Sequence, residues 1–301
     1  MMGFTESKRS DMSKHVHPDH TQNTFGLMNG KRGIILGVAN NHSLAWGIAE
    51  HLSKNGAEIA FTYPSEIMKK RVEPLAKSIG SDLIFPCDVS QEGDVERTFQ
   101  ALQKHWPTID FVVHSISFSD KNELRGDFLD LSRENFLNTM LVSCYSFIDV
   151  AKHAKPMMGP GASMVTLSYY GAEKVIPHYN AMALAKSALE TSVQYAAEDL
   201  GKKGIRVNTL SCGPIKTLAA SGIGDFHYIL QWSQSNAPLR RSITLDDVGK
   251  SALYILSDLS SGVTGETLHV DAGYHVVGMK AKDAKDIVLA PKDGAETVTR
   301  A

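Results

Sequence analysis

The chain has 301 residues, of which 43% are hydrophobic and 21% are charged, and its formal net charge at pH 7 is −2. This balance favours one large globular domain and gives no electrostatic reason to expect nucleic acid or an anionic membrane as a partner. No apolar run reaches the roughly 18–20 residues that span a bilayer, and the first residues lack the apolar stretch of a signal peptide, so we expect a soluble, cytoplasmic protein.

The two ends of the chain differ in composition from its middle. Residues 1–26 and 282–301 are polar and aperiodic, which is typical of mobile extensions. We therefore expect an N-terminal extension over 1–26, one folded domain over 27–281 and a C-terminal tail over 282–301.

Between these extensions, short β-branched runs alternate with longer amphipathic ones. The short runs predict strands at seven places: 32–38, 58–63, 82–89, 109–116, 163–168, 206–211 and 267–273. The longer patterns predict helices at about 44–54, 65–79, 91–105, 132–154, 179–200 and 246–257. Near-continuous apolar strands separated by helices indicate a seven-stranded parallel sheet covered on both faces, which is a doubly wound (Rossmann) α/β fold.

Ligands of such a sheet bind beyond the carboxyl ends of its strands. After the first strand, 37-GVANNHSLAWG-47 offers Gly37 for a tight turn, Ser43 at the start of a helix, and Gly47 for close approach of that helix to the sheet. A glycine turn alone is structural as often as functional, and this spacing is not G-x-G-x-x-G. Asp88, after the third strand, supports a nucleotide site because it can accept from an adenine amino group.

Tyr179 and Lys186 stand seven residues apart at the start of the helix that follows the fifth strand. At about 3.6 residues per turn, seven residues make almost two turns, so both side chains leave the helix from nearly the same face. A tyrosine keeps its phenolic proton at neutral pH, since its unperturbed pKa is near 10, and it can donate a hydrogen bond to charge that develops on a substrate oxygen. We therefore expect the pair to address one site.

The three cysteines, Cys87, Cys144 and Cys212, are far apart and odd in number. This arrangement predicts buried free thiols rather than disulfides or zinc ligands. The histidines of the N-terminal extension have no cysteine or carboxylate at ligand spacing, so we expect no metal site.

These motifs resemble the short-chain dehydrogenase/reductase superfamily, and within it the bacterial NAD-dependent enoyl-acyl-carrier-protein reductases of type II fatty acid synthesis. The resemblance runs from about Gly30 to Gly278 and is carried by 37-GVANNHSLAWG, 87-CDV, 114-HSI, 168-SYYGAEKVIPHYNAMALAK and 213-GPIKTLAASGI. Ordinary members place the catalytic tyrosine four residues before the lysine, where Met182 stands here. The enoyl reductase branch uses the wider spacing that Tyr179 and Lys186 match.

The resemblance implies the roles of individual residues. Tyr179, Lys186 and Tyr169 would be catalytic, with Lys186 bonded mainly to the nicotinamide ribose. Ser119, Tyr169 and Tyr179 would contact substrate. NADH would lie against ten residues: Gly37, Ser43, Leu44, Asp88, Val89, Ile116, Lys186, Ile215, Thr217 and Ala219. His114 would pack the cofactor pocket wall, and Tyr170 we expect to be structural.

One position departs from the family pattern. Many members have glutamine after the second strand, reaching the adenosine ribose, whereas this chain has Pro64 there, with Glu66 and Lys69 close by. Because no arginine follows the strand directly, we expect NADH rather than NADPH.

The resemblance also implies partners and a moving part. Small residues after the sixth strand, between about 216 and 231, suggest a lid over the substrate. The substrate would be carried on acyl carrier protein, and Arg240 and Arg241 are candidates for meeting its acidic surface. The helices at 132–154 and 179–200 are apolar around more of their surface than one sheet face covers, which predicts a two-fold symmetric homotetramer, as the family forms.

Two other functions fit the fold. A 3-ketoacyl or other carbonyl reductase would share the cofactor but needs the tyrosine where Met182 stands. A non-catalytic nucleotide-binding regulator would keep the glycine turn and have no reason to keep Tyr179 with Lys186.

Overall fold

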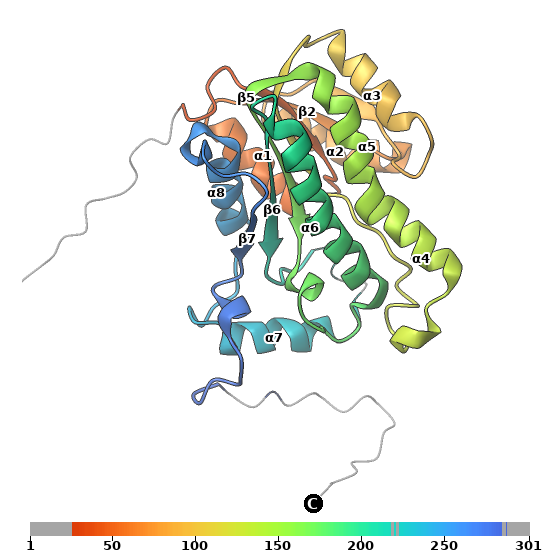
Figure 1. Ribbon diagram of the computed structural model, residues 1–301, viewed down its shortest axis with the longest axis vertical. Coiled ribbons are helices and arrows are strands. Elements are labelled where there is room, and N and C mark those ends of the chain that lie inside the picture. The colour runs from red at the N-terminus through yellow and green to blue at the C-terminus, as the bar shows by residue number, and fades with distance from the viewer. Residues whose placement is uncertain (1–25, 218–219, 221–222, 285–286, 288–301) are drawn as a thin grey trace, which may run out of the picture.

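The computed structural model describes residues 26–217, 220, 223–284 and 287 (Figure 1). Within them, seven strands form one sheet in the order β3-β2-β1-β4-β5-β6-β7, and every neighbouring pair is parallel. The strands are β1 (Arg32–Leu36), β2 (Glu58–Tyr63), β3 (Ile84–Pro86), β4 (Ile109–His114), β5 (Met158–Ser168), β6 (Arg206–Cys212) and β7 (Thr267–Val270). The predicted doubly wound α/β fold is confirmed.

Helices pack on both faces of this sheet. The helices of one face are α1 (Leu44–Lys54), α2 (Glu66–Ser78) and α8 (Leu245–Leu256), and those of the other are α3 (Asp94–Gln103), α5 (Ser146–Ala154) and α6 (Asn180–Gly201). A π-helical turn, Leu141–Tyr145, joins α4 (Arg133–Met140) to α5. In Figure 1, α7 (Phe226–Asn236) lies across the lower end of the molecule, beyond the ends of β6 and β7.

Strand residues alternate between the two apolar layers of the core. Ile34 and Val112 are fully buried in the layer with α3, α5 and α6, whereas Ile35 and Val113 are fully buried in the layer with α1 and α8. Side chains of a strand point to opposite faces in turn, so a sheet covered on both faces needs apolar residues at successive positions. This is why the strands read as continuous apolar runs.

Gly47 has a different neighbour from the one predicted. A Cβ atom at this position would lie 2.9 Å from Leu245 Cβ and 2.9 Å from Leu245 O, so the glycine lets α1 approach α8 rather than the sheet. The sequence predicted a close approach correctly, but its partner is about two hundred positions further along the chain and the local pattern does not reveal it.

The cysteines, possible membrane helices and possible metal sites were also considered from the sequence. The three cysteines are buried and free, as predicted. In the part of the chain that the structure describes, no helix is long and apolar enough to cross a membrane. In the same part, no three histidine, cysteine, aspartate or glutamate side chains gather in a way that could hold a metal ion.

Candidate active site

The turn between β1 and α1 lies where β1 meets β4, at the point where the strand order reverses. Gly37 has φ = 101°, and a Cβ atom there would lie 2.0 Å from Ser115 O, so only glycine fits. Ser43 Oγ accepts from the N–H groups of Ala39 and Asn40 at 3.0 and 3.1 Å. The turn is therefore held by its own serine, and the unpaired N–H groups at the start of α1 remain for a phosphate.

Other predicted cofactor residues follow β3 and β4 at the same edge of the sheet. Asp88 Oδ1 accepts from Ser90 N at 3.0 Å and from Ser90 Oγ at 2.7 Å, which fixes the carboxylate and leaves Oδ2 for an adenine amino group. Val89 and Ile116 are partly buried against the apolar layer of α3, α5 and α6. These positions suit the walls of a nucleotide pocket.

The first residue of α1 and the residues after β6 complete that edge. Leu44, which begins α1, and Ile215, which follows β6, are partly buried against the apolar layer of α1 and α8. Thr217 Oγ1 accepts from Ala220 N at 3.1 Å, which gives the chain a local turn. Ala219, also predicted to meet the cofactor, lies outside the described residues.

Tyr179 stands at the N-terminal boundary of α6 and is only 5% exposed. Its ring meets the ring of Tyr169 edge to face, with centroids 5.1 Å apart, and packs in a small apolar cluster with Leu124 and Met182. Burial raises the pKa of the Tyr179 phenol above its ordinary value, and the neighbouring Tyr169 adds to this. The phenol therefore keeps its proton at any physiological pH.

Lys186 lies almost two turns further along α6 and is also buried, at 6% exposure. Its Nζ donates to Leu167 O, near the end of β5, at 2.7 Å. In the described residues this is the one hydrogen bond that the structure gives the ammonium, so two N–H groups remain for a ligand. Burial lowers the pKa of Lys186 to about 8, although nearby Cys212 and Glu190 favour its charged form.

Tyr169 and Tyr170 are adjacent in the chain but have different contacts. Burial raises the pKa of Tyr169 as well, so its phenol is also protonated. The hydroxyl of Tyr170 donates to His275 O at 3.1 Å, and its ring packs edge to face on Tyr274, with centroids 5.9 Å apart. Tyr170 is thus a structural residue, as expected, while Tyr169 faces Tyr179.

His114 is enclosed in the core. Its Nδ1 lies 2.8 Å from Thr166 Oγ1 and its Nε2 lies 2.9 Å from Ser146 Oγ, so both ring nitrogens have partners inside the core. Burial, with a smaller contribution from Lys186, lowers the pKa of His114 to about 3. The ring is neutral and packs in the interior, which agrees with the expected packing role, while its place at the wall of a cofactor pocket stays a prediction.

Ser119, predicted to touch substrate, belongs to a hydroxyl and amide network. Its Oγ donates to Asn135 Oδ1 at 3.3 Å and accepts from Thr139 Oγ1 at 2.9 Å. Ser143, in the π-helical turn, accepts from Phe118 N and donates to Phe118 O at 2.8 and 3.0 Å. The network holds the segment after β4 against α4. No sequence pattern singled out Asn135, Thr139 or Ser143, because each acts through a partner 16 to 25 positions away.

Two hollows lie near the carboxyl edge of the last strands. One, of about 190 Å³, is lined by aromatic and aliphatic side chains: Tyr169, Val175, Ile176, Pro177, Tyr228, Ile229, Trp232, Ser233 and Tyr274. It lies beside Tyr169 and is apolar enough for an acyl chain. The other hollow has a volume of about 480 Å³, and neither Tyr179 nor Lys186 lines either of the two.

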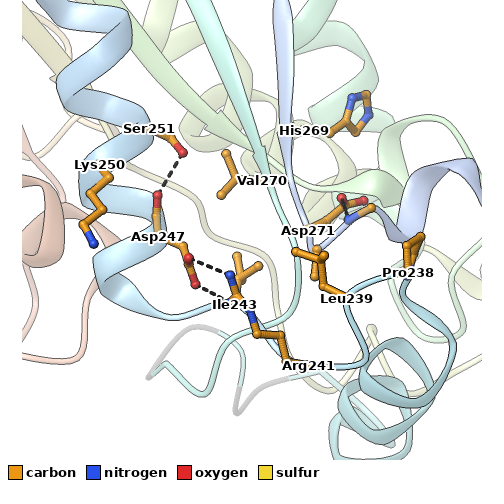
Figure 2. Close-up of a pocket in the computed structure, with 12 residues that line it drawn as sticks. Pro238, Leu239, Arg241, Ile243, Asp247, Lys250, Ser251, His269, Val270 and Asp271 are labelled. Atoms are coloured by element: carbon orange, nitrogen blue, oxygen red, sulfur yellow. Dashed lines mark hydrogen bonds and ion pairs between the residues drawn. The ribbon is translucent and has the colours of Figure 1, made fainter. Parts of the chain in front are cut away.

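The two predicted carrier-binding arginines each pair with a carboxylate, and Arg241 lines the larger hollow. Figure 2 shows Arg241 turned toward Asp247, whose carboxylate it meets at 2.6 and 2.9 Å. Arg240 pairs with Asp283 at 2.9 Å. Both guanidinium groups are neutralised by carboxylates of the same chain, which weakens them as candidates for an acidic partner surface.

Comparison with known proteins is consistent with this geometry. Residues 37–275 match the family model described as enoyl-(acyl carrier protein) reductase. Over 262 residues the chain is 62% identical to the NADH-dependent enoyl-acyl-carrier-protein reductase 1 of Rhizobium meliloti, covering 87% of this chain and 96% of the relative.

Solved structures agree with the family match. The chain resembles the enoyl-(acyl-carrier-protein) reductase of Anaplasma phagocytophilum in complex with NAD, with a TM-score of 0.83 and 58% identity over 87% of this chain and 98% of that one. It also resembles FabI of Candidatus Liberibacter asiaticus, with a TM-score of 0.84 and 50% identity over 85% of this chain and all of that one.

Proposed function

Because the chain belongs to the enoyl-(acyl carrier protein) reductase family, we propose that it reduces the trans-2 double bond of an enoyl thioester on acyl carrier protein, with NADH as reductant. The observation that carries this proposal within the chain is the buried pair Tyr179 and Lys186, two turns apart on α6, with Met182 at the position where a carbonyl reductase needs its tyrosine. A thioether cannot donate a proton to a ketone.

NADH, when bound, supplies the hydride that adds to Cβ of the double bond. Negative charge then develops on the thioester carbonyl oxygen, and the phenol of Tyr179 stabilises it by donating a hydrogen bond. A proton from water, taken up at Cα, completes the saturated acyl thioester. Burial keeps that phenol protonated, so it acts as a donor rather than as a base. Tyr169, whose ring meets Tyr179 edge to face, borders the same substrate pocket.

Lys186 serves the cofactor more than the phenol. Leu167 O holds its ammonium near the end of β5, and the remaining N–H groups suit the hydroxyls of the nicotinamide ribose. The pyrophosphate would lie on the turn of Gly37 and Ser43 and on the start of α1 at Leu44. The adenine and nicotinamide ends would meet the other predicted residues, namely Asp88, Val89, Ile116, Ile215, Thr217 and Ala219.

The end of β2 favours NADH over NADPH. Pro64 offers no side-chain donor there, and the nearby Lys69 is already engaged, since its Nζ lies 3.9 Å from Glu66 and 5.6 Å from the centre of the Tyr63 ring. A 2′-phosphate would find no free arginine directly after this strand. The printed names of the curated relatives also specify NADH.

We further propose a two-fold symmetric homotetramer of a reductase domain over 27–281, working in the cytoplasm where its carrier-bound substrate is made. Exposed apolar side chains on α4, α5, α6 and the joining turn support the assembly. They are Phe136, Leu137, Leu141, Tyr145, Ile148, Leu184 and Tyr195. A lid after β6 also stays a prediction: residues 218–219 and 221–222 lie outside the described part, and α7 occupies much of the remainder.

The proposed reaction is tested by the loss of NADH absorbance when the purified protein meets a trans-2-enoyl thioester. We expect turnover that depends on both compounds. Tight NADH binding without any turnover would instead favour the non-catalytic regulator. A carbonyl reductase would leave the enoyl thioester intact and consume NADH with a 3-ketoacyl thioester.

A further inference from the structure

Tyr179 lies between two residues with unusual backbone conformations. His178 has φ = 60° and Asn180 has φ = 29°, and they are two of the five non-glycine residues with positive φ in the described part of the chain. Left-handed backbone costs free energy in any residue with a Cβ atom and persists only where the surroundings enforce it. The peptide groups on both sides of the proposed hydrogen-bond donor are therefore held in place by their neighbours.

The side chain of Asn180 supplies part of that restraint. Its Nδ2 donates to Glu123 O at 3.1 Å and to Gly126 O at 3.0 Å, so both amide hydrogens bind the segment that follows β4. Asparagine also tolerates the left-handed region better than most residues. One side chain thus ties the backbone beside Tyr179 to a segment more than fifty positions earlier in the chain.

Hydrogen bonds and apolar packing hold residues Glu123 and Leu124 of that segment in place. The carboxylate of Glu123 accepts from Ser132 N at 2.9 Å and from Ser132 Oγ at 2.7 Å, at the start of α4. Leu124, the next residue, is only 5% exposed and packs in the cluster that contains Tyr179 and Met182. The Glu123 carbonyl group, one of the two that Asn180 binds, is therefore not free to move with it.

The ring of Tyr179 also lies against the backbone of Gly171. A Cβ atom at Gly171 would lie 2.3 Å from Tyr179 Cδ1, so the ring rests directly on the glycine. The ring of Tyr169 closes a further side, with centroids 5.1 Å apart. A small rotation of the backbone at residues 179 and 180 would move the phenol out of its contact with Tyr169 or press it against Gly171.

We propose that Asn180 is a positioning residue for Tyr179: its left-handed backbone and its two amide hydrogen bonds aim the phenol at the substrate carbonyl oxygen. This inference rests on the proposed enoyl reductase function, because it assigns the phenol the role of donor. Asn180 itself touches no reacting atom. Its effect on turnover must therefore pass entirely through Tyr179.

Two substitutions distinguish the effect of the left-handed backbone of Asn180 from the effect of its side-chain amide. Asn180→Gly accepts the left-handed conformation without strain and removes the amide, whereas Asn180→Asp keeps the shape but turns carboxylate oxygens toward two carbonyl oxygens. We expect kcat to fall roughly 10-fold in Asn180→Gly and further in Asn180→Asp, since losing the whole donor costs about 10²- to 10³-fold. KM and the NADH dissociation constant should stay close to those of the wild type.

The decisive measurement repeats Asn180→Gly in a Tyr179→Phe background. If Asn180 acts through the phenol, the substitution lowers kcat in the wild type and leaves it nearly unchanged in Tyr179→Phe. An equal loss in both backgrounds, or no loss in the wild type, would overturn the proposal. The control is Asn55→Ala, which removes a buried asparagine amide far from Tyr179, bonded to His51 O at 2.8 Å at the end of α1, and should lower the melting temperature without lowering kcat.

A second readout does not depend on the reaction. The ring NMR signals of Tyr179, assigned as the difference between the wild type and Tyr179→Phe, should report its edge-to-face packing on Tyr169. In Asn180→Gly these signals should shift, because the released ring leaves that contact. Unchanged signals would contradict the positioning role even if the wild type reduced no enoyl thioester, whereas signals that shift in Asn180→Gly while the wild type is inactive would contradict only the proposed function.

Discussion

Tyr179 and Lys186 leave α6 from nearly the same face, and burial moves their proton affinities in opposite directions. The apolar surroundings disfavour the phenolate and so raise the pKa of Tyr179. The same surroundings disfavour the ammonium and lower the pKa of Lys186 to about 8. A phenol with a raised pKa is a poor proton donor to a ketone but a dependable hydrogen-bond donor to an enolate, which agrees with reduction of a carbon–carbon double bond.

The phenol can be removed with little change in shape. Tyr179→Phe deletes one hydroxyl, so we expect kcat for a trans-2-enoyl thioester to fall about 10²- to 10³-fold. The NADH dissociation constant, measured by fluorescence titration, should stay near the wild-type value. Lys186→Ala provides the contrast, because it should weaken NADH binding markedly. Wild-type turnover in Tyr179→Phe would remove this residue from the proposed mechanism.

Lys186 should make stability depend on pH. Its folded pKa of about 8 lies below its value of about 10.4 in an unfolded chain, so the cost of burying the charge is present at neutral pH and disappears as pH rises through this window. Between pH 8 and 10.5 the unfolded state binds more protons, and the free energy of unfolding rises. Relative to Lys186→Met, wild-type protein should gain about 3 kcal/mol over this range in urea titrations. A constant difference between the two proteins would contradict a depressed pKa.

At the scale of elements, the sequence predicted which strands and helices follow one another along the chain, because each buried strand carries a continuous apolar run. It missed the π-helical turn at Leu141–Tyr145, because the amphipathic pattern over 132–154 continues across the change in hydrogen bonding, and it predicted no helix where α7 lies. It also missed residues that act through distant partners. Asn180 and Gly171 matter through a positive φ and a contact with a ring, and neither property can be read from local composition.

Helix α8 begins with a capping box. Thr244 Oγ1 accepts from Asp247 N at 3.2 Å, and the Asp247 carboxylate accepts from Thr244 N at 2.8 Å. Thr244→Ala removes one half of this pair, so the free energy of unfolding should fall by about 1 kcal/mol in denaturant titrations. Thr244→Ser keeps the hydroxyl and serves as the control. Equal losses in the two variants would show that the methyl group, rather than the cap, stabilises this end of α8.

At the scale of the whole molecule, the apolar surface of α5, α6 and the π-helical turn before α5 is more than one chain can cover. Tyr145 is 51% exposed, Ile148 46% and Tyr195 75%, and in Figure 1 the two helices run side by side on one face of the molecule. Apolar side chains grouped in this way are typical of an interface between copies. This surface is the physical basis for the proposed tetramer.

Light scattering tests that assembly. The wild type should show the mass of four chains at micromolar concentration, and Ile148→Glu, which places a charge in the proposed interface, should shift the mass toward smaller species. Lys70→Glu lies at an exposed position on α2, on the opposite face of the sheet, and changes the charge by two units rather than one, so it should leave the mass at that of four chains. A wild-type protein that stays monomeric would contradict the proposed tetramer.

The substrate preference tests the central claim most directly, because it depends on the Tyr179 to Lys186 spacing and on Met182 together. We would measure kcat/KM of the wild type, with NADH, for a trans-2-enoyl thioester and for the 3-ketoacyl thioester of the same chain length. The account predicts efficient reduction of the enoyl thioester and almost none of the ketoacyl thioester. A higher kcat/KM for the ketoacyl thioester would contradict it, since the chain would then be a carbonyl reductase.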